Sequence, residues 1–197
     1  TDAGGRAANV VQARAEVLYL VRAPEMAQAL ALAARVDKVA RGAAMMTETE
    51  VEIVFDTASS NLLPNITLET AMHDTMTALG PIAFDEEDIA YASAIQRTFT
   101  PEAIESSIRL YRIAGDVFSN TAVDGSTPLH LGLRAFEGQS HFRAGSTDVG
   151  DVSRVTPTAQ CWTAAWAIGT NPHTGQVVAQ GRNPAAHKAM VQAEKTL

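Results

Sequence analysis

The first 63 residues combine two patterns typical of strands with one pattern typical of a long helix. Residues 15–22 are rich in side chains that suit a pleated, partly buried surface, and residues 50–55 alternate acidic and apolar side chains. Residues 7–11 start a further short strand. Between the strands, apolar residues at helical spacing predict a helix over residues 24–46 with one apolar face. This order predicts a compact α+β unit, in which a helix lies on an antiparallel sheet.

The rest of the chain favours helices, after a boundary that the small and turn-forming residues 58–65 indicate. The four acidic residues at 85–88 are typical of the charged first turn of a helix, and this interpretation is preferred to a metal site. Helices are expected at residues 67–79, from residue 85 onward, at 100–113 and at 185–197, with a short strand at 129–136.

One stretch, residues 145–173, carries residue types that are common at functional sites. It begins with a glycine-bracketed loop that contains Asp148 and Asp151, continues with a run that alternates like a strand, and closes on a turn that presents His173. Rigid scaffolds usually hold their chemistry on such loops. The alternative is that the glycines only mark turns and that the two aspartates hydrogen-bond their own backbone.

Composition narrows the classes of partner that we expect. The chain has 197 residues, enough for one large or two small domains, and a formal net charge of -7, which makes nucleic acid an unfavourable partner. No apolar run approaches the roughly 20 residues of a membrane span. Cys161 is the single cysteine, so no intramolecular disulfide can form, and a reducing compartment such as the cytoplasm is expected. Because the chain starts at Thr1 without a signal-peptide pattern, we expect it to be part of a longer polypeptide.

Five motifs stand out along the chain: AGGRAANVV at residues 3–11, AEVLYLVRAP at 15–24, GAAMMT at 42–47, GSTDVGDVS at 145–153 and PHT at 172–174. Together they resemble the M20 family of metal-dependent amidohydrolases and peptidases. The resemblance covers nearly the whole chain, and two positions depart from the expected pattern, where Arg154 replaces an aromatic residue and Gly175 a tryptophan.

The resemblance implies a subunit with a catalytic α/β domain, which binds two divalent metal ions (Zn or Mn), and an inserted lid domain. Residues 1–63 would be the second half of the lid and residues 64–197 the C-terminal half of the catalytic domain. The general base and most metal ligands of this family lie in the other half of the catalytic domain. A lid sheet with exposed edges is normally paired, so a homodimer through the lid is expected, and a second subunit is a further possibility.

The resemblance also gives roles to four residues. His173 matches the family's C-terminal histidine ligand, and a neutral imidazole suits zinc or manganese. Asn9 and Arg22 match lid positions that hold the carbonyl and the carboxylate of the substrate. Asp148 lies in the loop that shapes the substrate pocket. The simpler alternatives are a surface histidine for His173, a turn residue for Asn9 and a strand-end charge for Arg22. Asp148 and Asp151 are interpreted as organisers of the loop rather than as catalytic acids.

Two functions follow from these expectations. The first is a part of a metal-dependent enzyme that hydrolyses the amide bond of N-acyl amino acids, with this chain alone inactive. The second is a non-catalytic relative that only binds ligands or dimerises. Cys161, on a predicted strand, is interpreted as a small buried residue, because no histidine follows it at a spacing typical of a nucleophile pair.

Overall fold

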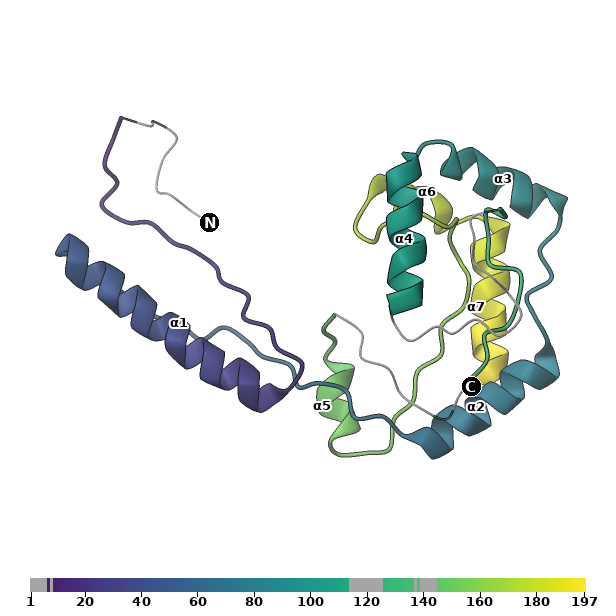
Figure 1. Ribbon diagram of the computed structural model, residues 1–197, viewed down its shortest axis with the longest axis horizontal. Helices are drawn as coiled ribbons and strands as arrows, with labels where there is room; N and C mark the ends of the chain where they lie inside the picture. Colours follow the sequence, from purple (N-terminus) through teal and green to yellow (C-terminus); the bar gives the residue numbers. More distant parts are fainter. Residues whose placement is uncertain (1–6, 8, 114–125, 137, 139–144) are drawn as a thin grey trace. The chain divides into compact units, whose positions relative to one another are not determined.

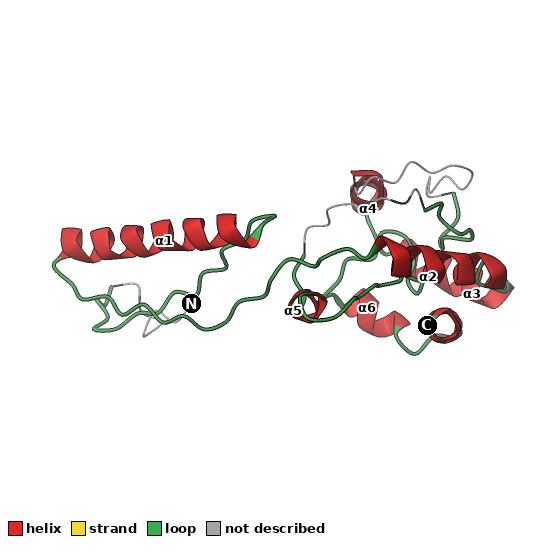
Figure 2. Ribbon diagram, turned by 90° about the horizontal axis from the view of Figure 1, so that it is seen from below, coloured by secondary structure: helices red, strands yellow, loops and turns green. Residues whose placement is uncertain are grey.

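The structure is a computed structural model that describes residues 7, 9–113, 126–136, 138 and 145–197 (Figure 1). Helices and loops make up these residues (Figure 2), and none of the helices is long and apolar enough to cross a membrane. The helices are α1 (Met26–Thr47), α2 (Ile66–Leu79), α3 (Glu86–Gln96), α4 (Pro101–Ile113), α5 (Val149–Ser153), α6 (Gly175–Gln180) and α7 (Pro184–Thr196).

The chain divides into two compact units. Unit 1 consists of Thr1–Asn61 and Ser146–Asp151, and unit 2 consists of Leu62–Gly145 and Val152–Leu197. This division does not say what either unit is. The assignment of residues 1–63 to a lid domain and of residues 64–197 to a catalytic domain therefore stays a prediction.

The predicted antiparallel sheet of the lid is wrong for the part of the chain that the structure describes. Residues 17–20 and 50–55 have no regular secondary structure, and Leu20 and Phe55 are both 77% exposed. The residue types are those of strands, but strand propensity mostly reflects packing against neighbouring strands and burial of one face. Within the described chain, these residues neither pair with a neighbouring strand nor bury one face. The expected α+β lid is therefore not supported, and neither is the argument that its exposed sheet edges pair in a dimer. The predicted strand at residues 129–136 is also wrong.

The predicted long helix is confirmed as α1 in unit 1. Its start is fixed by Gln28, whose side-chain Oε1 accepts a hydrogen bond from the backbone N–H of Glu25 at 3.3 Å. Its end is marked by Glu48, which adopts a left-handed backbone conformation with φ of 55°. No residue of α1 is buried, so its apolar face is not covered within the described chain.

The four helices predicted after the boundary are confirmed as α2, α3, α4 and α7, whereas α5 and α6 were not predicted. Short polar side chains define where α2 and α7 begin. The Asn65 carboxamide accepts a hydrogen bond from the N–H of Leu68 at the start of α2, and the Asn183 carboxamide accepts one from the N–H of Ala185 in α7. Such side chains satisfy backbone donors that the first helical turn leaves unpaired. The sequence therefore specifies these starts locally.

The core of unit 2 is small and built mainly from alanine and aliphatic residues. Leu129 is 1% exposed and lies among residues of three different segments, while Ile108 of α4 and Ile168 form a second cluster with Ile104. The α2 and α7 helices pack on each other, and the Gln192 side chain of α7 donates a hydrogen bond to the carbonyl of Gly80 at 2.9 Å. The first cluster consists of Ala92, Leu129, Ala167 and Ala185, with Phe84, Ile89 and Ile95 packed against it. Because alanine side chains are small, the segments that carry them approach closely.

A buried carboxylate links α3 to α7. The Asp88 side chain is 1% exposed, and its Oδ2 accepts hydrogen bonds from the Lys188 ammonium at 2.5 Å and from the Asp85 N–H at 3.0 Å. Asp85 caps the helix in return and also contacts Lys188. The hydrogen bond to Lys188 holds the pKa of Asp85 below its usual value, and the hydrogen bonds to Asp85 and Asp88 raise the pKa of Lys188. The contact between Asp85 and Lys188 therefore contributes its full stability between the ordinary pKa values of these two groups. Its contribution falls in stronger acid, where Asp85 is protonated, and in stronger base, where Lys188 is deprotonated.

We predict that Asp88→Asn destabilises unit 2. The substitution keeps the shape but removes the buried negative charge that Lys188 and the Asp85 N–H share. A hydrogen bond to a charged group contributes roughly 1.5–3 kcal/mol, so the free energy of unfolding should fall by about that amount. Urea unfolding followed by circular dichroism measures it. Asp74→Asn on the exposed side of α2 is the matched control and should change stability by less than about 0.5 kcal/mol. Equal stability of the two variants would contradict the structural role of Asp88.

Candidate functional site

The glycine-bracketed loop of residues 145–151 leads into a short helix rather than a strand. Thr147 accepts a hydrogen bond from the Gly150 N–H at 3.1 Å, and Asp148 accepts one from the Asp151 N–H at 3.0 Å, both through their carbonyl oxygens. These bonds form the first turn of α5. The predicted strand after the loop is therefore wrong, since α5 begins inside the loop and the residues after it have no regular structure.

Asp151 and Gly150 fix the position of the Ser60 segment within unit 1. Asp151 Oδ1 accepts a hydrogen bond from the Ser60 N–H at 3.0 Å, although the two residues are 91 positions apart in the sequence. A side chain at position 150 would not fit, because a Cβ atom built there lies 2.0 Å from the carbonyl oxygen of Ser60. Asp151 thus acts as a loop organiser, and Gly150 permits the close approach of two backbones.

His173 lies on the predicted turn in unit 2, two residues before the start of α6. Its side chain is exposed, and its backbone is left-handed with φ of 62°. This conformation is uncommon outside glycine, although histidine, asparagine and aspartate adopt it more often than other residues. Thr174 closes the turn by donating a hydrogen bond from its hydroxyl to the Asn171 carbonyl at 2.8 Å. The turn therefore presents the imidazole outward from a defined backbone.

Gln180 stabilises this turn through hydrogen bonds to residues before and after it, a role that the sequence did not predict. It is 3% exposed, accepts a hydrogen bond from the Ala167 N–H at 2.7 Å, and donates to the Thr170 hydroxyl and the Gln176 carbonyl. The hydrogen-bonding groups of an amide side chain must find partners when they are buried, so Gln180 joins the residues before the turn to the helix after it. A glutamine inside a helix gives no sequence signal for such a role.

The predicted substrate-binding residues lie in unit 1. Asn9 is in a turn, Arg22 is in the extended segment before α1, and Asp148 precedes α5; all three are exposed. Within the described chain no hydrogen bond or ion pair joins any two of them, and Asp148 accepts a hydrogen bond from the hydroxyl of Thr147 at 3.4 Å. His173 belongs to unit 2. A shared site formed by Asn9, Arg22, Asp148 and His173 therefore stays a prediction.

The remaining histidines differ from one another. His73 lies on α2 and His187 on α7, while His141 is outside the described residues. His130 differs from these in its surroundings. It is half-buried in a non-helical segment, and its Nε2 has no hydrogen-bond partner. Burial lowers the pKa of His130 below its usual value, and a hydrogen bond with the Gly132 backbone offsets part of this effect. Burial therefore favours the neutral form of the ring.

No group of three or more histidine, cysteine, aspartate or glutamate side chains that is able to hold a metal ion occurs among the described residues. A catalytic zinc takes about three protein ligands and a water molecule. His173 alone does not meet this need, so the described residues by themselves do not fit a metal centre. Cys161 is half-buried in a segment without regular structure, so its predicted strand is wrong.

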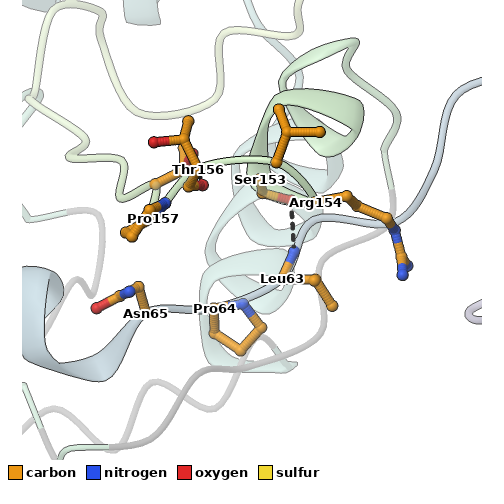
Figure 3. A pocket seen from close by; sticks show the side chains of 9 residues that line it. Leu63, Pro64, Asn65, Ser153, Arg154, Thr156 and Pro157 are labelled. Atoms are coloured by element: carbon orange, nitrogen blue, oxygen red, sulfur yellow. Dashed lines mark hydrogen bonds between the residues drawn. The ribbon is translucent and has the colours of Figure 1, made fainter.

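A groove with a volume of about 390 Å³ lies in unit 2 (Figure 3). Residues 63–65, which lead into α2, form one wall, and residues 153–158, which run onward from the last residue of α5, form the other. None of the four predicted site residues lines it. Arg154, one of the two positions that depart from the family pattern, does.

The resemblance seen in the sequence agrees with one match to a known protein. The chain is 44% identical over 201 residues to the B subunit of p-aminobenzoyl-glutamate hydrolase from Escherichia coli (strain K12). No family model matches the chain, and no solved structure matches it. The motifs at residues 3–11 and 145–153 predict similarity to this subunit within the M20 family. The similarity to the subunit is confirmed, and membership of the M20 family stays a prediction.

The extent of the match differs between the two proteins. It covers 100% of this chain but 41% of the relative. The chain is thus similar over its whole length to a subunit of p-aminobenzoyl-glutamate hydrolase and spans about two fifths of the length of that protein.

Proposed function

We propose that this chain is part of a hydrolase that cleaves the amide bond of N-acyl amino acids such as p-aminobenzoyl-glutamate. The observation that supports the proposal is the 44% identity over the whole chain to a subunit of p-aminobenzoyl-glutamate hydrolase. At this level of identity, retention of the reaction is the simplest expectation. Because the match covers 41% of the relative, the proposal concerns the activity of a longer parent protein.

Within the proposed enzyme, Arg22 and Asn9 bind the substrate. A guanidinium group forms two parallel hydrogen bonds with a carboxylate, which suits the α-carboxylate that every N-acyl amino acid carries. An asparagine amide donates a hydrogen bond to a carbonyl oxygen, here the acyl carbonyl. Both side chains are exposed in unit 1 and are therefore accessible to a small molecule.

His173 is proposed as one metal ligand, on a turn that Thr174 and Gln180 hold in place. The proposal follows the M20 resemblance in assigning two divalent ions, zinc or manganese, to the parent. Such ions lower the pKa of a bound water molecule. The further ligands and the general base are proposed to lie in the part of the parent that this chain does not span, since the described residues do not form a metal centre.

The parent is proposed to be an oligomeric protein of the cytoplasm. The name of the relative designates it as one subunit of a hydrolase, which supports association with a second subunit. A homodimer through the lid rests on the family resemblance, with α1 as the contact, because no residue of this helix is buried in the described chain.

The proposal is tested by hydrolysis of p-aminobenzoyl-glutamate. The full-length protein should release p-aminobenzoate and glutamate, and dialysis against a chelator should abolish the activity until zinc or manganese is restored. The 197-residue chain alone should show no turnover, because one histidine does not retain a catalytic metal. Release of p-aminobenzoate is followed by its absorbance. An inactive, metal-free full-length protein would contradict the proposal and favour the alternative of a non-catalytic ligand-binding or dimerisation module.

We predict that Arg22→Ala in the full-length protein weakens binding of substrates that carry a free carboxylate. A charge-assisted hydrogen bond contributes roughly 1.5–3 kcal/mol, so KM for the carboxylate substrate should rise about tenfold or more. An analogue with an amide in place of this carboxylate should lose much less. Arg14→Ala, in the same exposed part of unit 1, is the matched control. Equal losses for both substrates would assign Arg22 a role in folding.

We predict that His173→Asn lowers both the metal content and the activity of the full-length protein. Asparagine tolerates the left-handed backbone at position 173, so the turn should be kept while the imidazole is lost. Activity should fall at least about 100-fold if one of three or four ligands is removed. Metal content is measured by elemental analysis, with His187→Asn on α7 as the control that retains full content. Unchanged metal content in His173→Asn would exclude the ligand role.

A further inference from the structure

The turn that carries His173 is tied to its surroundings by one buried side chain, that of Gln180 in α6. Gln180 is 3% exposed, and its Oε1 accepts a hydrogen bond from the Ala167 N–H at 2.7 Å. Its Nε2 donates to the Thr170 hydroxyl at 3.0 Å and to the Gln176 carbonyl at 2.9 Å. Two of these partners precede His173 in the sequence and one follows it, so a single amide joins both ends of the turn.

The hydrogen bonds around Gln180 run in one direction only. The Thr170 hydroxyl donates its hydrogen to the Ala167 carbonyl at 2.7 Å, so toward Gln180 it acts as an acceptor. The Gln176 carbonyl is also an acceptor, whereas the Ala167 N–H is a donor. Position 180 therefore requires one acceptor and two donors at the end of a side chain of this length. A glutamine amide supplies all three, while a carboxylate supplies acceptors only and a thioether supplies no donor.

The segment before the turn is itself closely packed. Gly169 has a φ of 103°, and a Cβ atom built on it would lie 2.9 Å from a carbon of the Phe99 ring and 3.0 Å from a side-chain carbon of Ile104. Because the backbone lies against these two side chains, it has little room to move. The orientation of His173 relative to this segment then depends on the link across the turn, which Gln180 provides.

His173 depends on such a link more than most residues do. Its φ of 62° lies in the left-handed region, and a residue other than glycine keeps this conformation only where the surrounding structure imposes it. The imidazole is exposed, so packing of the ring does not hold it in one orientation. The direction of the imidazole is therefore set by the backbone of the turn.

We propose that Gln180 is a positioning residue of the proposed hydrolase, and that its three hydrogen bonds set the direction in which the turn presents the His173 imidazole. The inference rests on the proposed function, because it assumes that His173 takes part in the reaction. In that function Arg22 binds the carboxylate of the substrate. Loss of the Gln180 hydrogen bonds should therefore slow turnover and leave KM unchanged.

Gln180→Met in the full-length protein tests this proposal, with Gln192→Met as the matched control. Gln192 is a half-buried glutamine of α7 whose side chain donates a hydrogen bond to the carbonyl of Gly80 instead. Amide hydrogen exchange in peptides that cover residues 168–176 should be about tenfold faster in Gln180→Met and unchanged in Gln192→Met. For p-aminobenzoyl-glutamate, kcat should fall about tenfold or more in Gln180→Met, with KM changed less than about twofold. Both quantities are measured well below the unfolding temperature of each variant, so that only folded protein is compared.

A milder pair of variants decides the question if Gln180→Met does not fold. Thr170→Val keeps the shape of the side chain but removes the hydroxyl that accepts from Gln180, whereas Thr170→Ser keeps this hydroxyl. Thr170→Val should lower kcat and speed exchange in the turn, while Thr170→Ser should match the wild type.

Four results would each overturn the role of Gln180 in an active full-length protein. These are unchanged exchange in the turn, an unchanged kcat, a rise in KM that accounts for the loss of activity, and equal behaviour of the two Thr170 variants. Inactivity of the wild-type protein would contradict the hydrolase proposal itself, and with it this role. The two failures are therefore distinguishable.

Discussion

The buried carboxylate of Asp88 is the constraint on which unit 2 depends. An unpaired charge in an apolar interior is very unfavourable, so Asp88 requires both the Lys188 ammonium and the N–H of Asp85 in place at once. This requirement fixes the rotation of α3 and its separation from α7. The small alanine side chains of the core meet only in that arrangement, because they do not reach across a wider gap. The ion pair therefore gives a small core a defined geometry.

From this pair of helices, hydrogen bonds extend to the turn that carries His173. The Tyr91 hydroxyl of α3 donates to the carbonyl of Ala179 in α6 at 2.8 Å, and the Gln96 side chain donates to the carbonyl of Ile168 at 3.2 Å. Gln180 then connects the same two segments to each other. The turn is therefore supported from α3 on both of its sides. An exposed histidine with a left-handed backbone keeps one orientation only when its neighbours are held in this way.

The longer helices were predictable from the sequence, whereas the strands and the short helices α5 and α6 were not. For the strands the reason is physical. A helix satisfies its own backbone hydrogen bonds, and its start is encoded by a local side chain such as Asn65, Asp85 or Asn183. A strand requires a partner, and residues 17–20 and 50–55 have strand-forming side chains without a partner among the described residues. For the site, the turn of His173 was predictable from its proline and histidine. The support from Gln180 and the half-burial of His130 depend on distant contacts, which residue spacing does not encode.

The contact between Gly150 and Ser60 limits how related chains can diverge. Since the space beside the Gly150 Cα is already occupied by the Ser60 carbonyl, a relative that carries any larger residue there must route its counterpart of residues 58–61 along a different path. Length changes in that segment should accordingly accompany loss of this glycine during evolution. A glycine at this position in a homologous sequence therefore indicates that residues 58–61 and the start of α5 make the same close backbone contact there.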